Sequence, residues 1–392
     1  MSEVKIKNTI MNFGPQHPSS HGVLRMVLEL DGEVIKRAEP HIGQLHRGTE
    51  KLMEAKTYTQ NIPFMDRLDY VAPINYEHGW VLAAEKLLDI DIPLRAKYIR
   101  VLMLELSRIG KHIFGIGAQA IDCGAMTPMV WGFESREQLM EFFEAIAGSR
   151  LHLNYFRVGG VASDLPEGLL EKISAWCDQF EKDFKDVQIL LTDNRIFKQR
   201  TVDIGVVSKD QAIEFGLSGP NLRASGVAWD LRRAQPYEIY NDLDFNVIIG
   251  THGDCYDRYM VRVKEMYESL KIVRQCINNM PKGLVKIDNY KLTPPPRALM
   301  KESMEALIHH FKFFSEGFSV PKGEVYVPVE TPSGEFGVYL VSQGENKPYR
   351  ARLRSNGFMH LQIIKSLAIG YQLADLPSII GSFDIVFGEV DR

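Results

Sequence analysis

Apolar and polar residues alternate near the start of the chain, and this period of two predicts β-strands. Residues 23–30 (VLRMVLEL) and 33–39 (EVIKRAE) flank the pair Asp31-Gly32, which is typical of a tight hairpin turn. From residue 323 the same period returns in three short runs, EVYVPVE, FGVYLVS and PYRARLR. These runs predict a three-stranded meander, so we expect a small β unit near each end of the chain.

Between the two β units, apolar residues recur at spacings of three and four, as they do on the buried face of a helix. The pattern predicts core helices around 83–88 and over 99–113. Ser135-Arg-Glu-Gln138 matches a capping box that opens a helix, and Gly148 matches a helix end. The segment 281–296 ends in three prolines and is predicted to be a connector. Further helices are predicted at 166–190, 208–216, 254–280 and 297–317.

These elements predict an α+β fold with a large central helical bundle between two small β units. We divide the chain into an N-terminal β unit with a loop (residues 1–48), a helical domain (49–318) and a C-terminal meander with a terminal segment (319–392). The chain has 392 residues, of which 45% are hydrophobic and 24% charged. This composition is that of a globular protein long enough to bury its own core.

Charge and cysteine usage exclude several classes of protein. The chain has 46 Lys and Arg against 50 Asp and Glu, and no basic block interleaved with aromatic residues, so we expect no nucleic-acid partner. No Cys-x-x-Cys pair occurs, which argues against a zinc ribbon or an iron–sulfur site held by this chain alone.

The first residues lack the apolar core of a signal peptide, so we expect the chain to start in the cytoplasm. No run reaches the ~20 apolar residues of a spanning helix, so any membrane contact should be peripheral.

Two local patterns carry candidate chemistry of low specificity. Residues 115–120 match the loose dinucleotide pattern G-x-G-x-x-A, but the match lies within a predicted helix rather than between a strand and a helix, so we interpret it as close helix packing.

Four histidines near the start of the chain suggest a metal site, namely His17, His21, His41 and His46. Their spacing and the neighbouring Pro and Gly residues argue against one. The loop 14–22 is rich in Gly, Pro and His, a composition that suggests a functional site.

Two acidic positions leave two interpretations open. Asp122 ends the apolar stretch 113–121, where a carboxylate is costly unless it is paired or protonated. It is either a helix-terminal acid bonded to the backbone or to a surface Arg, or one partner of a distant His with which it exchanges a proton. The cluster Asp66-Arg67-Leu68-Asp69-Tyr70 is either solvated surface or the wall of a pocket.

Several long motifs follow one another in a single order. They are GPQHPSSHGVLR (14–25), PHIGQLHRGTEKL (40–52), TYTQNIPFMDRLDY (57–70), GAMTP (124–128), NYFRVGG (154–160), LRASGV (222–227), LTPPPR (292–297), KGEVYVPVE (322–330) and GEVDR (388–392). Together they resemble the large peripheral-arm subunit of respiratory complex I, the D-subunit family of NADH-quinone oxidoreductase. The resemblance extends from about residue 12 to residue 392.

That family is similar to the large subunit of nickel–iron hydrogenases, whose metal is held by Arg-x-Cys-Gly-x-Cys and Asp-Pro-Cys-x-x-Cys-x-x-His. The counterparts in this sequence are residues 67–72 and 384–392. The thiolate positions hold Asp69, Ala72, Val386 and Glu389. Without soft ligands the nickel site cannot form, so we expect no metal in this chain.

The resemblance implies that the vacated site binds a quinone head group beside a [4Fe–4S] cluster held by a neighbouring small subunit. Tyr70 and His21 match the family's hydrogen-bond partners of the head group, and Asp122 matches the acid that contacts that histidine. Arg67 and His152 match residues near the cluster, where a cation stabilises the reduced form and an imidazole couples its potential to pH.

The leading hypothesis is therefore a catalytic subunit of a proton-translocating NADH:quinone oxidoreductase, active only in the assembled complex. Its expected partners are the other peripheral-arm subunits, especially the small cluster-bearing one, the membrane arm and the quinone. We expect it on the cytoplasmic side of the bacterial inner membrane. The alternatives are a scaffold subunit without a chemical role and a membrane-bound hydrogenase large subunit, which the missing cysteines disfavour.

Overall fold

The computed structural model describes residues 8–392. The first seven residues of the predicted N-terminal unit, and our expectation about a signal peptide there, lie outside the described part. The N-terminal sheet has the antiparallel order β1-β2-β3 (Thr9–Phe13, Arg25–Asp31 and Val34–His41). The predicted hairpin is confirmed, with Gly32 at φ 64° in its turn, and β1 is a short strand that the alternation did not predict.

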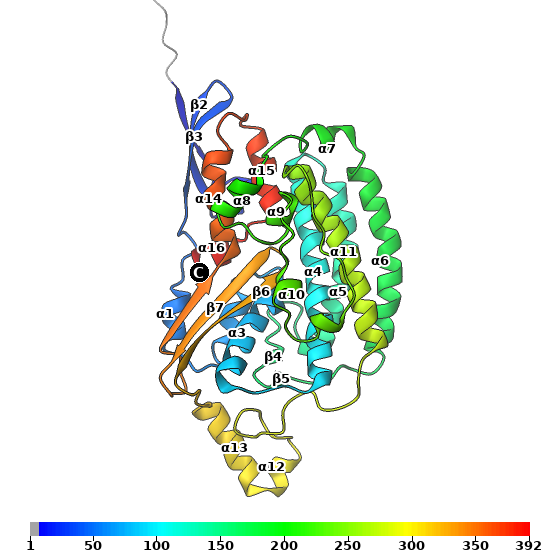
Figure 1. Cartoon of the computed structure of the whole chain (residues 1–392), viewed down its shortest axis with the longest axis vertical. Coiled ribbons are helices and arrows are strands. Elements are labelled where there is room, and N and C mark those ends of the chain that lie inside the picture. The colour runs from blue at the N-terminus through cyan, green and yellow to red at the C-terminus, as the bar shows by residue number, and fades with distance from the viewer. Residues whose placement is uncertain (1–7) are drawn as a thin grey trace, which may run out of the picture.

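Four long helices pack side by side on one side of the molecule, at the right of Figure 1: α4 (Leu94–Asp122), α5 (Thr127–Ala147), α6 (Leu169–Leu191) and α11 (Cys255–Asn278). They confirm the predicted helical bundle. The other central elements are α1 (Thr49–Met53), α2 (Ile62–Asp66), α3 (Pro73–Leu88), β4 (Phe156–Arg157), β5 (Gly160–Val161), α7 (Arg195–Gln199), α8 (Lys209–Glu214), α9 (Gly219–Ala224), α10 (Leu231–Ala234) and the 3₁₀ turns Pro18–Ser20 and Tyr240–Asp242.

Two predicted helix boundaries are wrong. The helix expected to open at Ser135 begins at Thr127, because Pro128 in its first turn is already set for a helical start and nothing interrupts the helix before Ser135. The single helix predicted over 297–317 is two, α12 (Leu299–Glu302) and α13 (Met304–Ser315). Ser303 between them has extended backbone, and its hydroxyl caps α13 by accepting from the N–H of Ala306.

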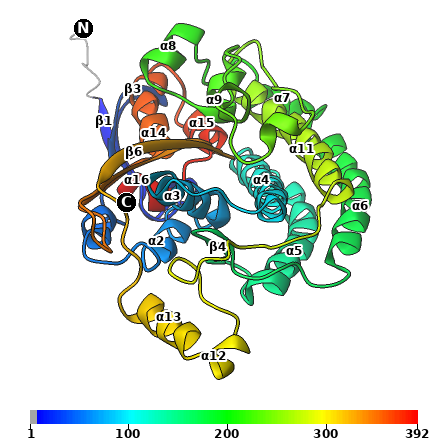
Figure 2. The ribbon, with the colours of Figure 1, turned by 60° about the horizontal axis from the view of Figure 1, so that its bottom comes forward.

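The C-terminal meander is confirmed as the antiparallel sheet β6-β7-β8 (Gly323–Thr331, Gly334–Ser342 and Arg350–Arg354). Figure 2 shows this sheet arching over α3, against which β6 and β7 pack. Three further helices that the pattern did not predict follow it: α14 (Asn356–Leu367), α15 (Asp375–Phe383) and α16 (Phe387–Asp391).

Two hydrophobic cores hold these elements together. In the larger core, residues of the central helices such as Ile109 pack with the C-terminal sheet, for example Val338. In the smaller core, Leu28 and Ile35 of the N-terminal sheet pack with α14 and α15, for example Ile380. The last third of the chain thus contributes to both cores, and the three-part division of the chain stays a prediction. No helix within residues 8–392 is both long and apolar enough to cross a membrane.

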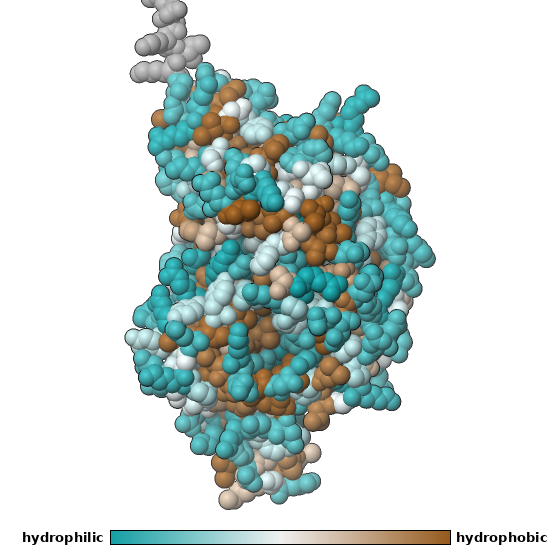
Figure 3. Space-filling view, in the orientation of Figure 1, coloured by the Kyte–Doolittle hydropathy of each residue, from teal (hydrophilic) through white to brown (hydrophobic). Residues whose placement is uncertain are grey.

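Helices α12 and α13 form an arm that protrudes from the body, with apolar side chains on its surface (Figures 1 and 3). Leu307, Phe311 and Phe314 are each more than half exposed, and Ala306 is the one buried residue of α13. The arm therefore adds little to either core.

Candidate functional site

A cavity of about 370 Å³ lies where four distant parts of the chain meet. It is lined by the loop that carries His21, by Tyr70 after α2, by the last turns of α4 and by the junction of α15 with α16. Its walls are Pro18, His21, Tyr70, Val71, Phe114, Ala118, Ile121, Asp122, Met129, Gly381, Asp384, Ile385 and Val386. Three of the five predicted site residues, His21, Tyr70 and Asp122, therefore share one cavity.

His21 ends the short 3₁₀ turn Pro18–Ser20 in a left-handed conformation, with φ 52°. Its Nδ1 lies 3.1 Å from the backbone oxygen of Ile385. In the neutral ring Nδ1–H donates to that carbonyl, which leaves Nε2 as an acceptor. Although His21 keeps exposed surface, protein atoms crowd its ring, and this burial lowers its pKa with help from Lys111, against the opposing charge of Asp384.

Tyr70 is 42% exposed in the cavity wall. Partial burial of its ring raises the pKa of the phenol, and the carboxylates of Asp69 and Asp384 raise it further, while Lys111 opposes them. The hydroxyl therefore keeps its proton at neutral pH. A phenol in this state is a hydrogen-bond donor to whatever occupies the cavity.

Asp122 is the last residue of α4 and accepts a hydrogen bond of 2.5 Å from the hydroxyl of Ser19. Burial raises its pKa to about 6, against the opposing effect of that bond. Gly381 leaves room for the carboxylate, since a Cβ there would lie 2.2 Å from Oδ2. Among the described residues His21 and Asp122 share no hydrogen bond or ion pair, because His21 bonds Ile385 and Asp122 bonds Ser19.

A buried lysine that sequence reasoning did not single out stands behind Tyr70. Lys111 Nζ lies 3.4 Å from Asp69 Oδ2 and 3.6 Å from Asp384 Oδ1. Burial opposes its charge, but the two carboxylates outweigh that effect and raise its pKa. Lys111 is one of several charged residues of α4 and gave no signal of its own, and its partners lie 42 and 273 residues away in sequence.

Glu389 is the second buried group near the cavity that sequence reasoning left without a role of its own. The Tyr76 hydroxyl donates to its Oε2 at 2.5 Å, and the N–H of Gly357 donates to its Oε1 at 3.2 Å. Burial and the charge of Asp69 raise its pKa to about 8. Lys111, Asp69, Asp384 and Glu389 thus form an ionisable cluster beside Tyr70.

The two segments compared with the hydrogenase ligands meet in space. A Cβ on Gly388 would lie 2.5 Å from the backbone oxygen of Leu68, so the terminal helix passes directly over residues 67 and 68. Within residues 8–392 no group of three or more His, Cys, Asp or Glu side chains is arranged to hold a metal ion.

Arg67 and His152, the other two predicted residues, lie together outside the cavity lining. His152 Nδ1 is 3.1 Å from the backbone oxygen of Asp66, directly before Arg67 in the chain. Burial lowers the pKa of His152, and Arg67 and Arg47 add to that effect. The exposed Arg67 is fixed by a 2.9 Å hydrogen bond to the backbone oxygen of Pro63. The structure therefore sorts the predicted residues into a cavity group and a surface group.

Comparison with known proteins gives a consistent result over the whole chain. A model of the family described as "Respiratory-chain NADH dehydrogenase, 49 Kd subunit" matches residues 122–392. The chain is 60% identical over 387 residues to the NADH-quinone oxidoreductase D-subunit of Wolbachia pipientis subsp. Culex pipiens (strain wPip), with 99% of each chain covered. It is 59% identical over 392 residues to the D-subunit of Paramagnetospirillum magneticum, with both chains fully covered. The chain belongs to this family.

Membership confirms the resemblance to the D-subunit of complex I and the α+β fold expected from it. The chain is thus a subunit of an oxidoreductase complex of the respiratory chain. The roles of individual residues stay predictions.

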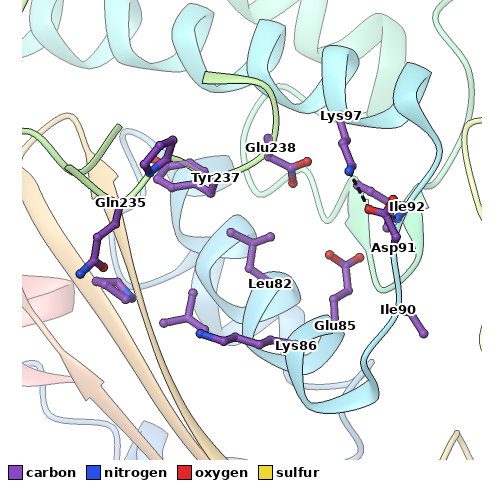
Figure 4. Close-up of a pocket in the computed structure, with 13 residues that line it drawn as sticks. Leu82, Glu85, Lys86, Ile90, Asp91, Ile92, Lys97, Gln235, Tyr237 and Glu238 are labelled. Atoms are coloured by element: carbon purple, nitrogen blue, oxygen red, sulfur yellow. Dashed lines mark hydrogen bonds and ion pairs between the residues drawn. The ribbon is translucent and has the colours of Figure 1, made fainter. Parts of the chain in front are cut away.

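A second cavity, of about 420 Å³, lies between the end of α3 and the start of α4 (Figure 4). None of the five predicted site residues of this D-subunit lines the second cavity. Its carboxylates Glu85 and Glu238 both bond Arg100, at 2.7 and 2.9 Å. Lys97 pairs with Asp91 at its edge. Each of the three carboxylates of this cavity is therefore paired with a cation.

Proposed function

We propose that this chain forms the quinone-reducing pocket of a proton-translocating NADH:quinone oxidoreductase, with the head group in the cavity of His21, Tyr70 and Asp122. Electrons reach it from a [4Fe–4S] cluster held by a neighbouring small subunit. The observation that carries the proposal is that a protonated phenol and an imidazole from distant parts of the chain line one cavity of about 370 Å³.

The residue types fit the reaction. Reduction of a quinone to a quinol takes two electrons and two protons, so each carbonyl oxygen needs a donor within hydrogen-bond distance. Tyr70 supplies one proton donor, and His21 in its protonated form supplies the other. Because burial lowers the pKa of His21, its imidazolium gives up the proton readily. Asp122, whose pKa is about 6, changes charge close to neutral pH beside it.

The proposal gives the surface group a separate role. Arg67 and His152 would lie against the small cluster-bearing subunit, where the guanidinium would place a positive charge near the cluster and the imidazole would be a group able to bind a proton. The other peripheral-arm subunits and the membrane arm are the remaining partners. The chain then lies at the cytoplasmic face of the bacterial inner membrane without spanning it.

The test is substitution in the assembled complex. Tyr70→Phe and His21→Ala are each expected to lower the rate of quinone reduction about 10²-fold, which is typical of the loss of a proton donor. NADH oxidation with an artificial water-soluble acceptor should stay at the wild-type rate, because those electrons leave before the quinone. The exposed Tyr349 and His252 provide matched controls as Tyr349→Phe and His252→Ala.

Near-normal quinone reduction in both variants, with assembly intact, would overturn the proposal and favour a scaffold role. Nickel in the purified complex, bound by this chain, would favour a hydrogenase. Asp, Ala, Val and Glu at the thiolate positions argue against that outcome.

A further inference from the structure

Two buried carboxyl groups face each other behind the segment that carries His152. Asp66 ends α2 and Glu77 lies in the first turns of α3, and both are 0% exposed. The two groups are neighbours, because they accept hydrogen bonds from the consecutive backbone N–H groups of Asn154 and Tyr155. One oxygen of each, Asp66 Oδ1 and Glu77 Oε1, has no donor among the described residues as long as both groups are ionised. A buried acceptor without a donor is costly, and two adjacent buried negative charges are more so.

The remaining oxygens of the pair hold the segment 152–156. Glu77 Oε2 accepts from the backbone N–H groups of Tyr155 and Phe156, each at 2.9 Å. Asp66 Oδ2 accepts from the N–H of Asn154 at 3.2 Å. The backbone oxygen of Asp66 bonds His152 Nδ1. His152 and Asn154 have φ of 57° and 47°, a left-handed conformation that non-glycine residues adopt at a cost, so the segment needs these bonds to keep its shape.

We propose that Asp66 and Glu77 hold one proton between them, with Asp66 as the acid and Glu77 as the carboxylate, and that this pair positions His152. The shared proton supplies the missing hydrogen bond between Asp66 Oδ1 and Glu77 Oε1. Glu77 carries the charge because two backbone N–H groups point at it, whereas Asp66 receives one. The pair then carries a single negative charge and fixes the three backbone N–H groups around His152.

The charges around the pair agree with this assignment. Burial and the charge of Glu77 raise the pKa of Asp66, while the nearby Arg67 opposes them. The cations facing Glu77 and His152 are Arg157 for the first and Arg67 with Arg47 for the second. Burial raises the pKa of Glu77 as well, but Arg157 and the backbone donors lower it, so Glu77 is the member that ionises first.

The consequence concerns the tautomer of His152. With Nδ1–H committed to the Asp66 carbonyl, a proton taken up by the ring goes to Nε2. The Asp66–Glu77 pair maintains the hydrogen bond between His152 Nδ1–H and the Asp66 carbonyl. It also keeps the negative charge near His152 on Glu77 rather than on Asp66. This last step bears on electron transfer only through the proposed function, whereas the shared proton and the positioning of His152 are properties of the chain itself.

Infrared spectroscopy of the full chain tests the shared proton through the C=O stretching band of a protonated carboxylic acid, measured against pH. Because Glu389 contributes a band of its own, the band of the pair is the one that the wild type shows at pH 7 and that Asp66→Asn lacks in the difference spectrum. In Glu77→Gln the amide donates to Asp66, which then becomes the carboxylate, so the band should disappear at a pH lower by more than about 1 unit. Glu389→Gln is the control, since Glu389 is another buried acid with a raised pKa and its loss should leave the band of the pair unchanged.

Histidine-selective NMR of the same variants tests the positioning role, with the His152 signal assigned from His152→Gln. Glu77→Gln moves the negative charge onto Asp66, whose carbonyl holds the ring, and should raise the pKa of His152 by about 1 unit. Asp66→Asn leaves the charge on Glu77 and should change it little. An ordinary packing role would not produce this asymmetry.

A wild-type spectrum without the band, a band unaffected by Glu77→Gln, or equal His152 shifts in both variants would overturn the inference. If Glu77→Gln does not fold, the loss of the band in Asp66→Asn still decides whether Asp66 is the acid. Neither measurement uses quinone reduction, so their failure leaves the proposed function standing, and failure of the Tyr70 and His21 test leaves the shared proton standing.

Discussion

The two cavities of about 420 and 370 Å³ differ in how their charged side chains are balanced. In the cavity of Figure 4, burial would raise the pKa of Glu238, but Arg100 and His78 outweigh it and lower the pKa to about 2. In the cavity with Tyr70, the carboxyl of Asp122 has a hydroxyl partner, Ser19, and its pKa is about 6. An acid paired with arginine stays ionised at all physiological pH values, whereas Asp122 titrates near neutrality, as the proposed proton chemistry in the cavity with Tyr70 requires.

The largest effect is expected from a substitution that removes the arginine from the ion pairs of the cavity in Figure 4. Arg100 is fully buried and bonds Glu85, Glu238 and two backbone oxygens. Arg100→Met removes the only arginine that pairs with these two buried carboxylates and leaves them His78 and the N–H of Gly159, so we expect the free energy of unfolding to fall by about 3–5 kcal/mol. Urea denaturation of the full chain measures it. A loss below about 1 kcal/mol would show that the network is dispensable and that the contrast between the cavities is wrong.

A smaller effect is expected in the cavity with Tyr70, where Gly381 leaves space for Asp122. In Gly381→Ala the new Cβ would lie 2.2 Å from Asp122 Oδ2, so the carboxylate must move, at a cost of about 1–3 kcal/mol of unfolding free energy. In the control Gly323→Ala the Cβ meets Leu87 at an ordinary 3.5 Å. Thermal unfolding of both variants gives the comparison, and equal melting temperatures would mean that Asp122 is not confined by Gly381.

The smallest effect is a pH dependence. Because folding raises the pKa of Asp122 to about 6 from its usual 3.8, the folded state binds the proton more tightly. The stabilisation that comes from the proton on Asp122 is therefore lost as pH rises from about 4 to about 6, and it stays lost at higher pH. Asp122→Asn should match the wild type below pH 4 and exceed it above pH 6 by on the order of 1 kcal/mol. Urea denaturation of both proteins below pH 4 and above pH 6 tests this. A difference in unfolding free energy that does not change with pH would contradict it.

The parts of the fold with strong local signals were predictable. The Asp31-Gly32 hairpin, the end of α5 at Gly148 and the C-terminal meander were predicted correctly because their periodicity and turn residues are local. The start of α5 was not, because a capping box at Ser135 is equally compatible with the interior of a helix. Helices α14 to α16 were missed because their apolar residues pack on one another and on elements far away in sequence, such as β3 for α14 and α4 for α15.

The candidate site was predictable only through resemblance. Local sequence placed Asp122 at a helix end but could not show that its hydroxyl donor comes from Ser19, 103 residues away. Two charged residues of α4, Arg100 and Lys111, are fully buried. Their acidic partners come from other elements, up to the last residues of the chain. Such pairings depend on tertiary structure and leave no spacing pattern to read.

The most direct test of the central claim is a structure of the assembled complex with a bound quinone analogue. The account predicts that the analogue's head group lies in the cavity of His21, Tyr70 and Asp122, with its two oxygens within hydrogen-bond distance of the Tyr70 hydroxyl and the His21 ring. A head group bound in the cavity of Figure 4, or elsewhere beyond reach of Tyr70 and His21, would contradict it.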